Sequence, residues 1–178
     1  TVRIISGQFR GKKLIAPSNL PVRPTTDFAK TGLFNILNNY YSFEKIAVLD
    51  LYAGTGNLSF EFASRGCSDI TAIDKDSHCC SYMNKTAQQL NISASLKVLQ
   101  SDVLTYLSNS KKQADIIIAD PPYAETPASE LVNLIFENQL LKPNGVFILE
   151  HSSEVDFSQL PHYLQTRKYG FVSFTFFE

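Results

Sequence analysis

The amino-acid sequence predicts an α/β fold in which helices cover both faces of an open, mostly parallel sheet. Three features support this fold class. Strand-like and helix-like segments alternate from residue 46 to residue 151, a glycine-rich turn follows the first of these strands, and the last residues form two β-rich runs. Regular alternation of this kind is typical of parallel strands that are joined by right-handed crossovers over the faces of a sheet.

The first forty residues predict a β-hairpin and then a helix. Apolar residues alternate or run together over 2–6 and 12–16, and the glycine-containing segment between them reads as a turn. Thr25 and Thr26 offer N-cap oxygens for a helix over about 27–40, which carries an apolar stripe.

The alternating region follows this helix. We expect strands at 46–52, 70–74, 96–100, 114–120 and 145–151. We expect helices near 57–65, 77–90, 102–109 and 127–140. After residue 160, two β-rich runs joined at Gly170 predict a terminal hairpin, so the sheet should end in an antiparallel pair. The whole chain, 1–178, is predicted to be one domain in which 1–42 extend a core of 43–178.

Composition excludes several classes of protein. Of the 178 residues, 44% are hydrophobic and 19% charged, which is ordinary for a globular chain. The three cysteines, Cys67, Cys79 and Cys80, have no C-x-x-C spacing, so we predict neither a metal site nor a disulfide framework. No apolar run has membrane-spanning length and the first residues are polar and basic. We therefore expect a cytoplasmic monomer that does not contact a membrane.

Charge is distributed unevenly along the chain. The net charge is −1, but residues 1–30 carry six basic residues and one acid, which gives +5 there and −6 in the remainder. A basic arm on an acidic body favours a polyanionic partner, although a solvated surface explains the same charges equally well. The basic residues at the predicted hairpin turn are Arg10, Lys12 and Lys13.

A glycine-rich turn follows the first strand of the alternating region in "LDLYAGTGNLSFEF". Gly54 and Gly56 would let the backbone approach a ligand at a helix N-terminus. The spacing is close to a dinucleotide fingerprint, but Ser59 occupies the third glycine position. Asp50, four residues before the first glycine, would repel a pyrophosphate and attract a cation. The turn therefore favours a positively charged small molecule over a dinucleotide, with a purely structural turn as the alternative.

Acidic residues also follow the next two strands. Asp74 lies twenty residues after Gly54, where an acid typically accepts hydrogen bonds from both ribose hydroxyls of a nucleoside. Asp76 competes for this role, but its position suits a cap on the following helix better. Asp102 follows the third strand, where it can accept from an adenine amino group or cap the next helix, and we favour both roles together.

The fourth strand ends in "DPPY", residues 120–123. Two consecutive prolines end strand pairing and hold the segment rigid. Asp120 and a neighbouring carbonyl can then both accept from a planar –NH2 group while Tyr123 stacks on the ring that bears it. A nucleobase amino group is a poor nucleophile, so it needs a strong electrophile such as a sulfonium methyl group. The motifs together predict nucleobase N-methylation that depends on S-adenosylmethionine.

Four segments carry a resemblance to a known family. "VRIISGQFRGKKL", "RPTTDFAKTGLFNIL", "LDLYAGTGNLSFEFASRG" and "DPPY" occur in this order and closely resemble the bacterial RsmD-type enzymes. That family methylates N2 of one guanine in 16S ribosomal RNA. The resemblance implies a Rossmann-like, seven-stranded class I S-adenosylmethionine-dependent methyltransferase with an added N-terminal hairpin. It also implies a substrate of 16S ribosomal RNA in an assembled or assembling small ribosomal subunit.

The resemblance also implies roles for individual residues. Gly54 and Gly56 would line the methionine part of the cofactor, Asp74 the ribose and Asp102 the adenine. The predicted cofactor contacts are Asp50, Tyr52, Ala53, Gly54, Thr55, Gly56, Asp74, Lys75, Asp102, Val103 and Asp120. The predicted catalytic residues, which hold the target base, are Asp120, Pro121, Pro122 and Tyr123.

The segment after "RPTTD" departs from the family pattern. The family usually continues with a basic pair and a glutamate, where this chain has Phe28, Ala29, Lys30 and Thr31. Arg23 and Thr26 keep the pattern. These two residues either contact cofactor or RNA, or they form a turn and a helix cap. Arg10, Lys12 and Lys13 are predicted to contact RNA.

Three other functions share part of this pattern. A nicotinamide-dependent dehydrogenase would share the glycine turn and Asp74, but it needs the third glycine and has no use for "DPPY". A non-catalytic RNA-binding module would leave the cofactor and base sockets unexplained. An adenine-N6 methyltransferase uses the same proline segment but usually carries a separate target-recognition region, for which 178 residues leave no room.

Overall fold

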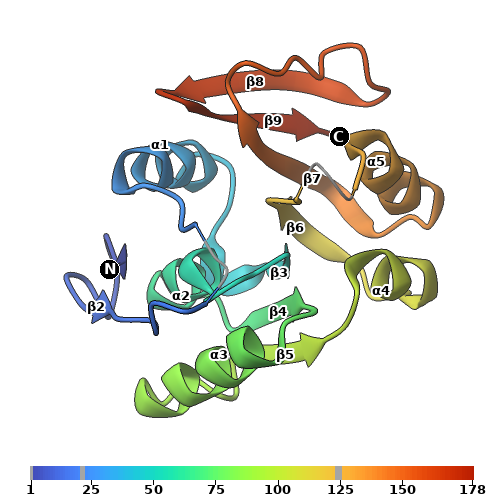
Figure 1. The fold of residues 1–178 in the computed structure, drawn as a ribbon. Helices are drawn as coiled ribbons and strands as arrows, with labels where there is room; N and C mark the ends of the chain where they lie inside the picture. The colour runs from blue at the N-terminus through green and yellow to red at the C-terminus, as the bar shows by residue number, and fades with distance from the viewer. Residues whose placement is uncertain (1, 21–22, 123–125) are drawn as a thin grey trace.

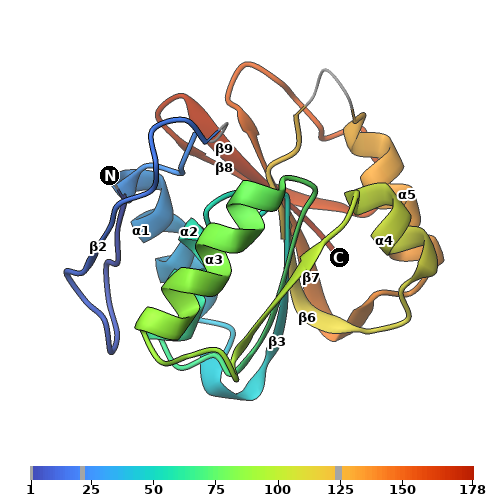
Figure 2. The same ribbon diagram turned by 60° about the horizontal axis from the view of Figure 1, so that its bottom comes forward.

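A seven-stranded sheet in the order β5-β4-β3-β6-β7-β9-β8 forms the centre of the structure (Figures 1 and 2). The computed structural model describes residues 2–20, 23–122 and 126–178. The sheet strands are β3 (Ala47–Leu51), β4 (Asp69–Asp74), β5 (Leu96–Gln100), β6 (Ala114–Ala119), β7 (Leu141–Ser152), β8 (Tyr163–Tyr169) and β9 (Val172–Phe177). The first five run parallel, and β9 joins β7 and β8 by antiparallel pairing.

Helices cover both faces of this sheet. They are α1 (Asp27–Asn38), α2 (Asn57–Ser64), α3 (Ser77–Gln89), α4 (Val103–Asn109) and α5 (Ala128–Glu137), with a short 3-10 turn, η1 (Phe43–Lys45). Buried residues of α1, α2 and α3 share one hydrophobic core, and those of α4 and α5 share a second. The two cores lie on opposite faces of the sheet, because alternate residues of each buried strand enter one core or the other.

The predicted elements are confirmed, most boundaries agree within two residues, and three elements differ by more. The hairpin pairs only over β1 (Val2–Arg3) and β2 (Lys13–Leu14). Helix α5 ends before the predicted residue 140, because Gln139 adopts a left-handed φ of 53° that no α-helix continues through. Strand β7 begins four residues before the predicted 145, since Leu141 already pairs with Ala114 before an irregularity in the ladder.

The N-terminal hairpin packs on helix α2. The backbone N–H groups of Ile5 and Ser6 donate to the Glu61 carboxylate at 2.9 and 3.2 Å. Lys30 is fully buried beneath the hairpin, where its Nζ donates to the Arg3 carbonyl at 2.7 Å and lies 3.2 Å from Glu61. Lys30 therefore neutralises a buried acid and is not part of an exposed basic arm.

Two classes of feature do not occur in the part of the chain that the structure describes. None of its helices is long and apolar enough to cross a membrane. Within the same residues, no group of three or more His, Cys, Asp and Glu side chains is arranged to hold a metal ion.

Candidate active site

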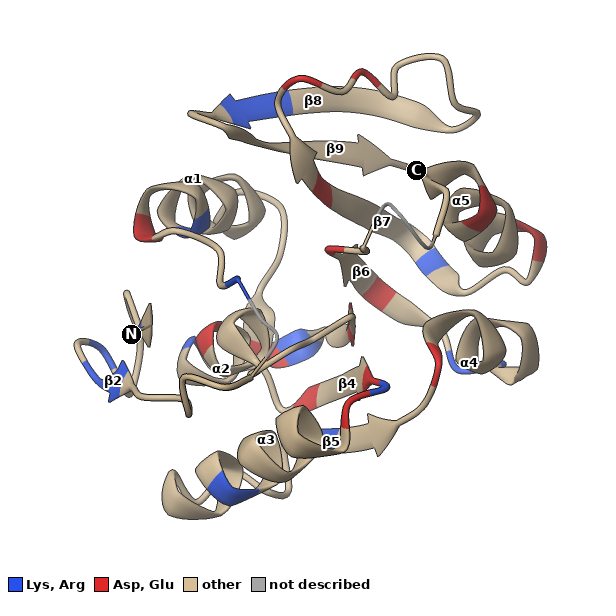
Figure 3. Ribbon diagram, in the orientation of Figure 1, with Lys and Arg blue, Asp and Glu red and all other residues tan. Residues whose placement is uncertain are grey.

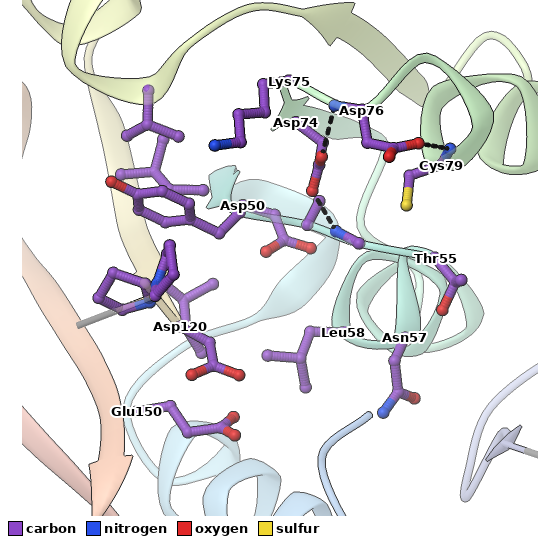
Figure 4. Close-up of a pocket in the computed structure, with 18 of the residues that line it drawn as sticks. Asp50, Thr55, Asn57, Leu58, Asp74, Lys75, Asp76, Cys79, Asp120 and Glu150 are labelled. Atoms are coloured by element: carbon purple, nitrogen blue, oxygen red, sulfur yellow. Dashed lines mark hydrogen bonds between the residues drawn. The ribbon is translucent and has the colours of Figure 1, made fainter. Parts of the chain in front are cut away.

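A cavity of about 860 Å³ opens at the carboxyl ends of β3, β4, β6 and β7. Strand β3 lies between β4 and β6, so the crossovers to its two neighbours run in opposite directions. Ligands of open α/β sheets bind at this reversal point, where two adjacent loops separate. Figure 4 shows that acidic side chains from four strand ends point into the cavity.

The glycine-rich turn forms one wall of the cavity. Gly54 and Gly56 have left-handed φ values of 60° and 83°, which glycine adopts without steric cost. A Cβ on Gly56 would lie 2.8 Å from the Phe60 ring and 3.0 Å from Met83, so a side chain is excluded there. Tyr52 also has a left-handed φ of 57°, an uncommon and strained conformation for a bulky residue. Its hydroxyl donates to Thr126 at 3.3 Å.

Asp74 fixes the position of this turn. One carboxylate oxygen accepts the Gly54 N–H at 2.8 Å, and the other accepts the Asp76 N–H at 2.9 Å. Each oxygen of an ionised carboxylate has a second lone pair. The side chain therefore holds the loop and keeps acceptor capacity on the side that faces the cavity.

The two neighbouring acids cap helices. Asp76 accepts the N–H groups of His78 and Cys79 at the start of α3, at 2.8 and 3.0 Å. Asp102 accepts the N–H of Thr105 at 3.0 Å at the start of α4. The predicted cap roles are confirmed, and both residues also line the cavity.

Asp50 lies at the floor of the cavity and is only 4% exposed. The Ser59 hydroxyl donates to its carboxylate at 2.6 Å. Burial raises the pKa of Asp50 to about 7, the hydrogen bond from Ser59 opposes that rise, and the negative charge of Asp74 adds to it. Ser59, the residue in the place of the third fingerprint glycine, is thus a hydrogen-bond donor to the acid that begins the motif.

Asp120 and Glu150 form a carboxyl pair on the opposite wall. Asp120 keeps solvent-accessible surface toward the cavity, but the surrounding walls desolvate it and raise its pKa to about 6. Glu150 is 6% exposed and accepts a hydrogen bond from the Thr25 hydroxyl at 2.6 Å. Burial raises the pKa of Glu150 to about 8, and the nearby charges of Asp120 and Asp50 act in the same direction.

The structure brings most of the predicted site residues together. Those that line the cavity are Arg23, Asp50, Tyr52, Ala53, Gly54, Thr55, Asp74, Lys75, Asp102, Val103, Asp120, Pro121 and Pro122. Gly56 lies behind the turn as the residue before α2. Tyr123 lies outside the described residues.

The residues that were predicted to contact RNA divide into two groups. Arg10, Lys12 and Lys13 lie at the exposed turn of the hairpin, away from the cavity, and Arg23 lies at the cavity. Thr26 caps α1, since its hydroxyl oxygen accepts the Ala29 N–H at 3.2 Å.

Sequence reasoning missed several cavity residues, among them Glu150 and its hydrogen-bond partner Thr25. The signal for Glu150 was a single carboxylate near the end of the apolar run "GVFILEH".

Comparison with known proteins identifies the family. Residues 2–178 match a family described as "Conserved hypothetical protein 95". The ribosomal RNA small subunit methyltransferase D of Haemophilus influenzae is 34% identical over 152 residues, which cover 84% of this chain and 78% of that protein. The chain belongs to the RsmD-type methyltransferase family.

Solved structures agree with this membership. A putative methyltransferase, yhhF, from Escherichia coli superposes with a TM-score of 0.86 at 26% identity, over 99% of this chain and 96% of that one. The 16S rRNA N2 G1207 methyltransferase RsmC of T. thermophilus, solved with AdoMet and guanosine, has a TM-score of 0.70 at 24% identity. This second likeness covers 89% of our chain and 45% of RsmC, and it shows the shared fold. The RsmD-type protein therefore has the class I methyltransferase fold.

The cavity of the RsmD-type protein fits S-adenosylmethionine, the cofactor of class I methyltransferases. The carboxylate of Asp50 lies at the floor and suits a sulfonium cation. The carboxylate of Asp74 lies on one wall and suits a ribose. The turn around Gly54 lets backbone approach a ligand, and the 860 Å³ volume lies within the usual range of small-molecule pockets.

Proposed function

We propose that the protein transfers a methyl group from S-adenosylmethionine to N2 of a guanine in 16S ribosomal RNA of the small subunit. One observation carries the proposal. The Asp120 carboxylate, followed by two prolines, opens onto the same cavity as the cofactor-type acids of β3 and β4. A methyl donor and an amino acceptor can therefore meet inside one pocket.

Residues at the ends of β3 and β4 and in the loop after β5 form the half of the pocket that binds the cofactor. Asp74 accepts from the ribose hydroxyls with the lone pairs that its backbone bonds leave free. Asp102 and Val103 contact the adenine, and the backbone at Gly54 contacts the methionine part. When bound, the cofactor supplies an electrophilic methyl carbon on a positively charged sulfur. Asp50 balances that charge from the floor of the pocket.

Residues directly after β6 form the half of the pocket that binds the target base. Asp120 and the carbonyl of Pro121 accept from the two N–H bonds of a planar amino group, which raises electron density on nitrogen. The proline rings fix this segment, so the acceptors need little reorganisation when the base binds. The pair of acceptors also gives the departing proton a destination.

Two further observations favour ribosomal RNA and the guanine amino group. The Haemophilus relative is a small-subunit ribosomal RNA methyltransferase, and RsmC, which shares the fold, acts on N2 of a 16S guanine. The exposed cations of the hairpin, Arg10, Lys12 and Lys13, supply phosphate contacts that position a large RNA without reading its sequence. An assembled or assembling small subunit offers the fixed RNA shape that such contacts need.

A complementation experiment tests this function. Ribosomal RNA is isolated from cells that lack the gene and carry wild-type protein, Asp120→Ala or no protein, and its nucleosides are quantified by mass spectrometry. We expect N2-methylguanosine of 16S RNA to fall by one residue per subunit without the protein and to return only with the wild type. Unchanged N2-methylguanosine in the deletion strain refutes the product, and a loss of N6-methyladenosine instead would assign the protein to the adenine-specific class.

A further inference from the structure

Glu150 is the pocket carboxyl group for which the proposed chemistry has no assigned role. Strand β7 pairs with β6 in parallel, and Leu149 lies opposite Ala119, the last residue of β6. The next residues along the two strands, Glu150 and Asp120, are therefore neighbours at the carboxyl edge of the sheet. Figure 4 shows their side chains facing each other across the pocket wall.

The two carboxyl groups form a hydrogen bond, which requires a proton between them. Glu150 suits the donor role because it is the more deeply buried group, at 6% exposed, whereas Asp120 keeps solvent-accessible surface. Thr25 donates to the Oε1 atom of Glu150 at 2.6 Å, so that oxygen acts as an acceptor. The proton therefore belongs on the other oxygen of Glu150, on the side of Asp120.

Thr25 itself is held by a buried chain of hydrogen bonds. Its carbonyl accepts from Asn57 Nδ2 at 3.1 Å, and Asn57 Oδ1 accepts from Lys30 Nζ at 2.7 Å. Asn57 is 7% exposed and Lys30 is fully buried. Glu150 is thus connected through Thr25 to residues of α1 and α2, and its side chain faces Asp120 (Figure 4).

The charges around the pair decide which group carries the proton. Asp50 on β3 and Asp120 after β6 face Glu150 as negative groups, while Arg23 before α1 acts on Asp120 as a positive one. Burial raises the pKa of Glu150 to about 8 and that of Asp120 to about 6. The two groups titrate as a coupled pair, and the deeper burial of Glu150 favours the shared proton on Glu150.

We propose that Glu150 is a positioning residue that, in its protonated form, donates a hydrogen bond to Asp120 and keeps that carboxylate ionised and aimed at the substrate amino group. The inference rests on the proposed function for its substrate. In the transfer, the lone pair of the amino nitrogen forms the bond to the methyl carbon, and the electrons of the broken carbon–sulfur bond stay on sulfur. One proton then leaves the nitrogen for Asp120, which passes it to water.

Two substitutions of Glu150 distinguish this role from others. Glu150→Gln keeps the length of the side chain and an N–H donor toward Asp120, whereas Glu150→Ala removes the donor. Glu154→Gln, at an exposed position shortly after β7, is the matched control. Circular dichroism and thermal melts establish that each variant is folded, and calorimetry establishes that its S-adenosylmethionine affinity stays within about twofold of wild type.

The first measurement is the titration of the pocket carboxyl groups by carbon-detected NMR in the protein without ligands. We expect Asp120 and Glu150 of the wild type to titrate in two coupled steps, near pH 6 and near pH 8. The Glu150→Gln variant should show only the titration step of Asp120. The Glu154→Gln variant should show both titration steps. A wild type in which both carboxyl groups titrate below pH 5 would show that no proton is shared, and it would overturn the inference without any use of substrate.

The second measurement is single-turnover methylation of small subunits as a function of pH. At pH 7, we expect Glu150→Ala to be about ten- to 150-fold slower, the range for losing a hydrogen bond to a charged group, and Glu150→Gln to keep at least roughly a third of the wild-type rate. The wild-type profile should bend near pH 8, where Glu150 loses its proton, and the Glu150→Gln profile should not. Equal losses in the Ala and Gln variants would mean that the ionised form of Glu150 acts, which contradicts the proposal.

The two measurements separate this inference from the proposed function. If the wild type does not methylate small subunits, the proposed function fails, yet the titration still reports whether the pair shares a proton. If the wild type methylates and Glu150→Ala is as fast as wild type, the proposed function stands and the role of Glu150 is refuted.

Discussion

At the scale of single residues, the pocket is built from carboxylates that have different environments. Asp74 is held by two backbone N–H groups, Asp50 is buried with one hydroxyl donor, and Asp120 lies beside the carboxyl group of Glu150. Hydrogen bonds to the charged form favour ionisation, and desolvation opposes it. The same residue type can therefore bind a neutral ribose, balance a cation or accept a proton, according to its neighbours.

The role proposed for Asp74 predicts a loss of cofactor affinity. Asp74→Ala removes the ribose acceptor and releases the Gly54 N–H, so we expect S-adenosylmethionine to bind about 1.5–3 kcal/mol more weakly. This is roughly ten- to 150-fold in the dissociation constant, measurable by calorimetry. Asp76→Ala is the control, because it removes a helix cap and should change melting temperature more than affinity. An unchanged constant in a folded Asp74→Ala protein would transfer the ribose role to Asp76.

The burial of Asp50 predicts a pH-dependent stability. Its folded-state pKa of about 7 lies above the unfolded value, so the folded protein holds this proton more tightly. Wild-type stability relative to Asp50→Asn should be highest below about pH 4, fall as pH rises toward 7, and stay constant above it. Urea unfolding at pH 5 and pH 8 should show the difference changing by on the order of a few kcal/mol. If the stability difference between wild type and Asp50→Asn is the same at pH 5 and pH 8, Asp50 is ionised over this whole pH range.

At the scale of elements, helix α1 and helix α2 depend on contacts that their own sequences do not reveal. Gly32 lowers the helix propensity of α1, but a Cβ there would lie 2.1 Å from the Tyr169 ring of β8, so the glycine permits close packing. On α2, Glu61 accepts from the hairpin backbone and pairs with Lys30 and, at 2.8 Å, with Arg65. Helix α2 thus begins at the glycine-rich turn of the pocket, and its later residues hold the N-terminal hairpin.

The buried ion pair of Glu61 gives a prediction for this element. Glu61→Ala leaves Lys30 fully buried without its counter-charge, so we expect a loss of roughly 3–5 kcal/mol in the free energy of unfolding. Asp69→Ala breaks the half-exposed pair with Lys112 and should cost about 0–1 kcal/mol. Urea denaturation of both variants checks the contrast. If both variants, Glu61→Ala and Asp69→Ala, lose similarly little unfolding free energy, Lys30 loses its proton or reaches water when the Glu61 side chain is removed.

At the scale of the whole molecule, the hairpin and the pocket form one connected unit. Figure 3 places the Lys and Arg residues of the hairpin turn at one side, beside α2, and acidic residues at the carboxyl ends of the strands. The hairpin is tied to α2 by backbone bonds to Glu61 and Ser64, and α2 begins at the glycine-rich turn of the pocket. The proposed docking of RNA on the hairpin would therefore hold the RNA at a fixed distance from the pocket.

This arrangement predicts how binding depends on salt. Changing Arg10, Lys12 and Lys13 together to Ala should weaken binding to small subunits and flatten the log affinity against log salt slope by roughly 0.7–0.9 for each lost phosphate contact. S-adenosylmethionine affinity should stay at the wild-type value, because these side chains lie outside the cavity.

Filter binding over a salt series measures the slope. A triple variant of three other exposed lysines, Lys45, Lys85 and Lys97, is the matched control with the same change in net charge. If both triple variants change the slope equally, the effect is one of total charge, and the hairpin does not contact RNA.

Much of this molecule was predictable from local patterns. Alternating strands and helices, the turn around Gly54 and the caps at Asp76 and Asp102 depend on neighbours within a few residues, so the sequence alone determined them. The meeting of Asp50, Asp74 and Asp120 was also predictable, because parallel strands bring their carboxyl ends to one edge.

Other features were decided only by the tertiary structure. The sequence shows Lys30 as one more basic residue of the arm, whereas the fold buries it against Glu61, thirty-one positions away. Thr25 and Glu150 are 125 residues apart and meet through a 2.6 Å hydrogen bond. The ionisation of a carboxyl group depends on burial and on charges brought near by folding, and neither is encoded in local spacing. The sequence thus determined that Asp50, Asp74 and Asp120 reach the pocket, and only the packing showed that Glu150 lies beside Asp120.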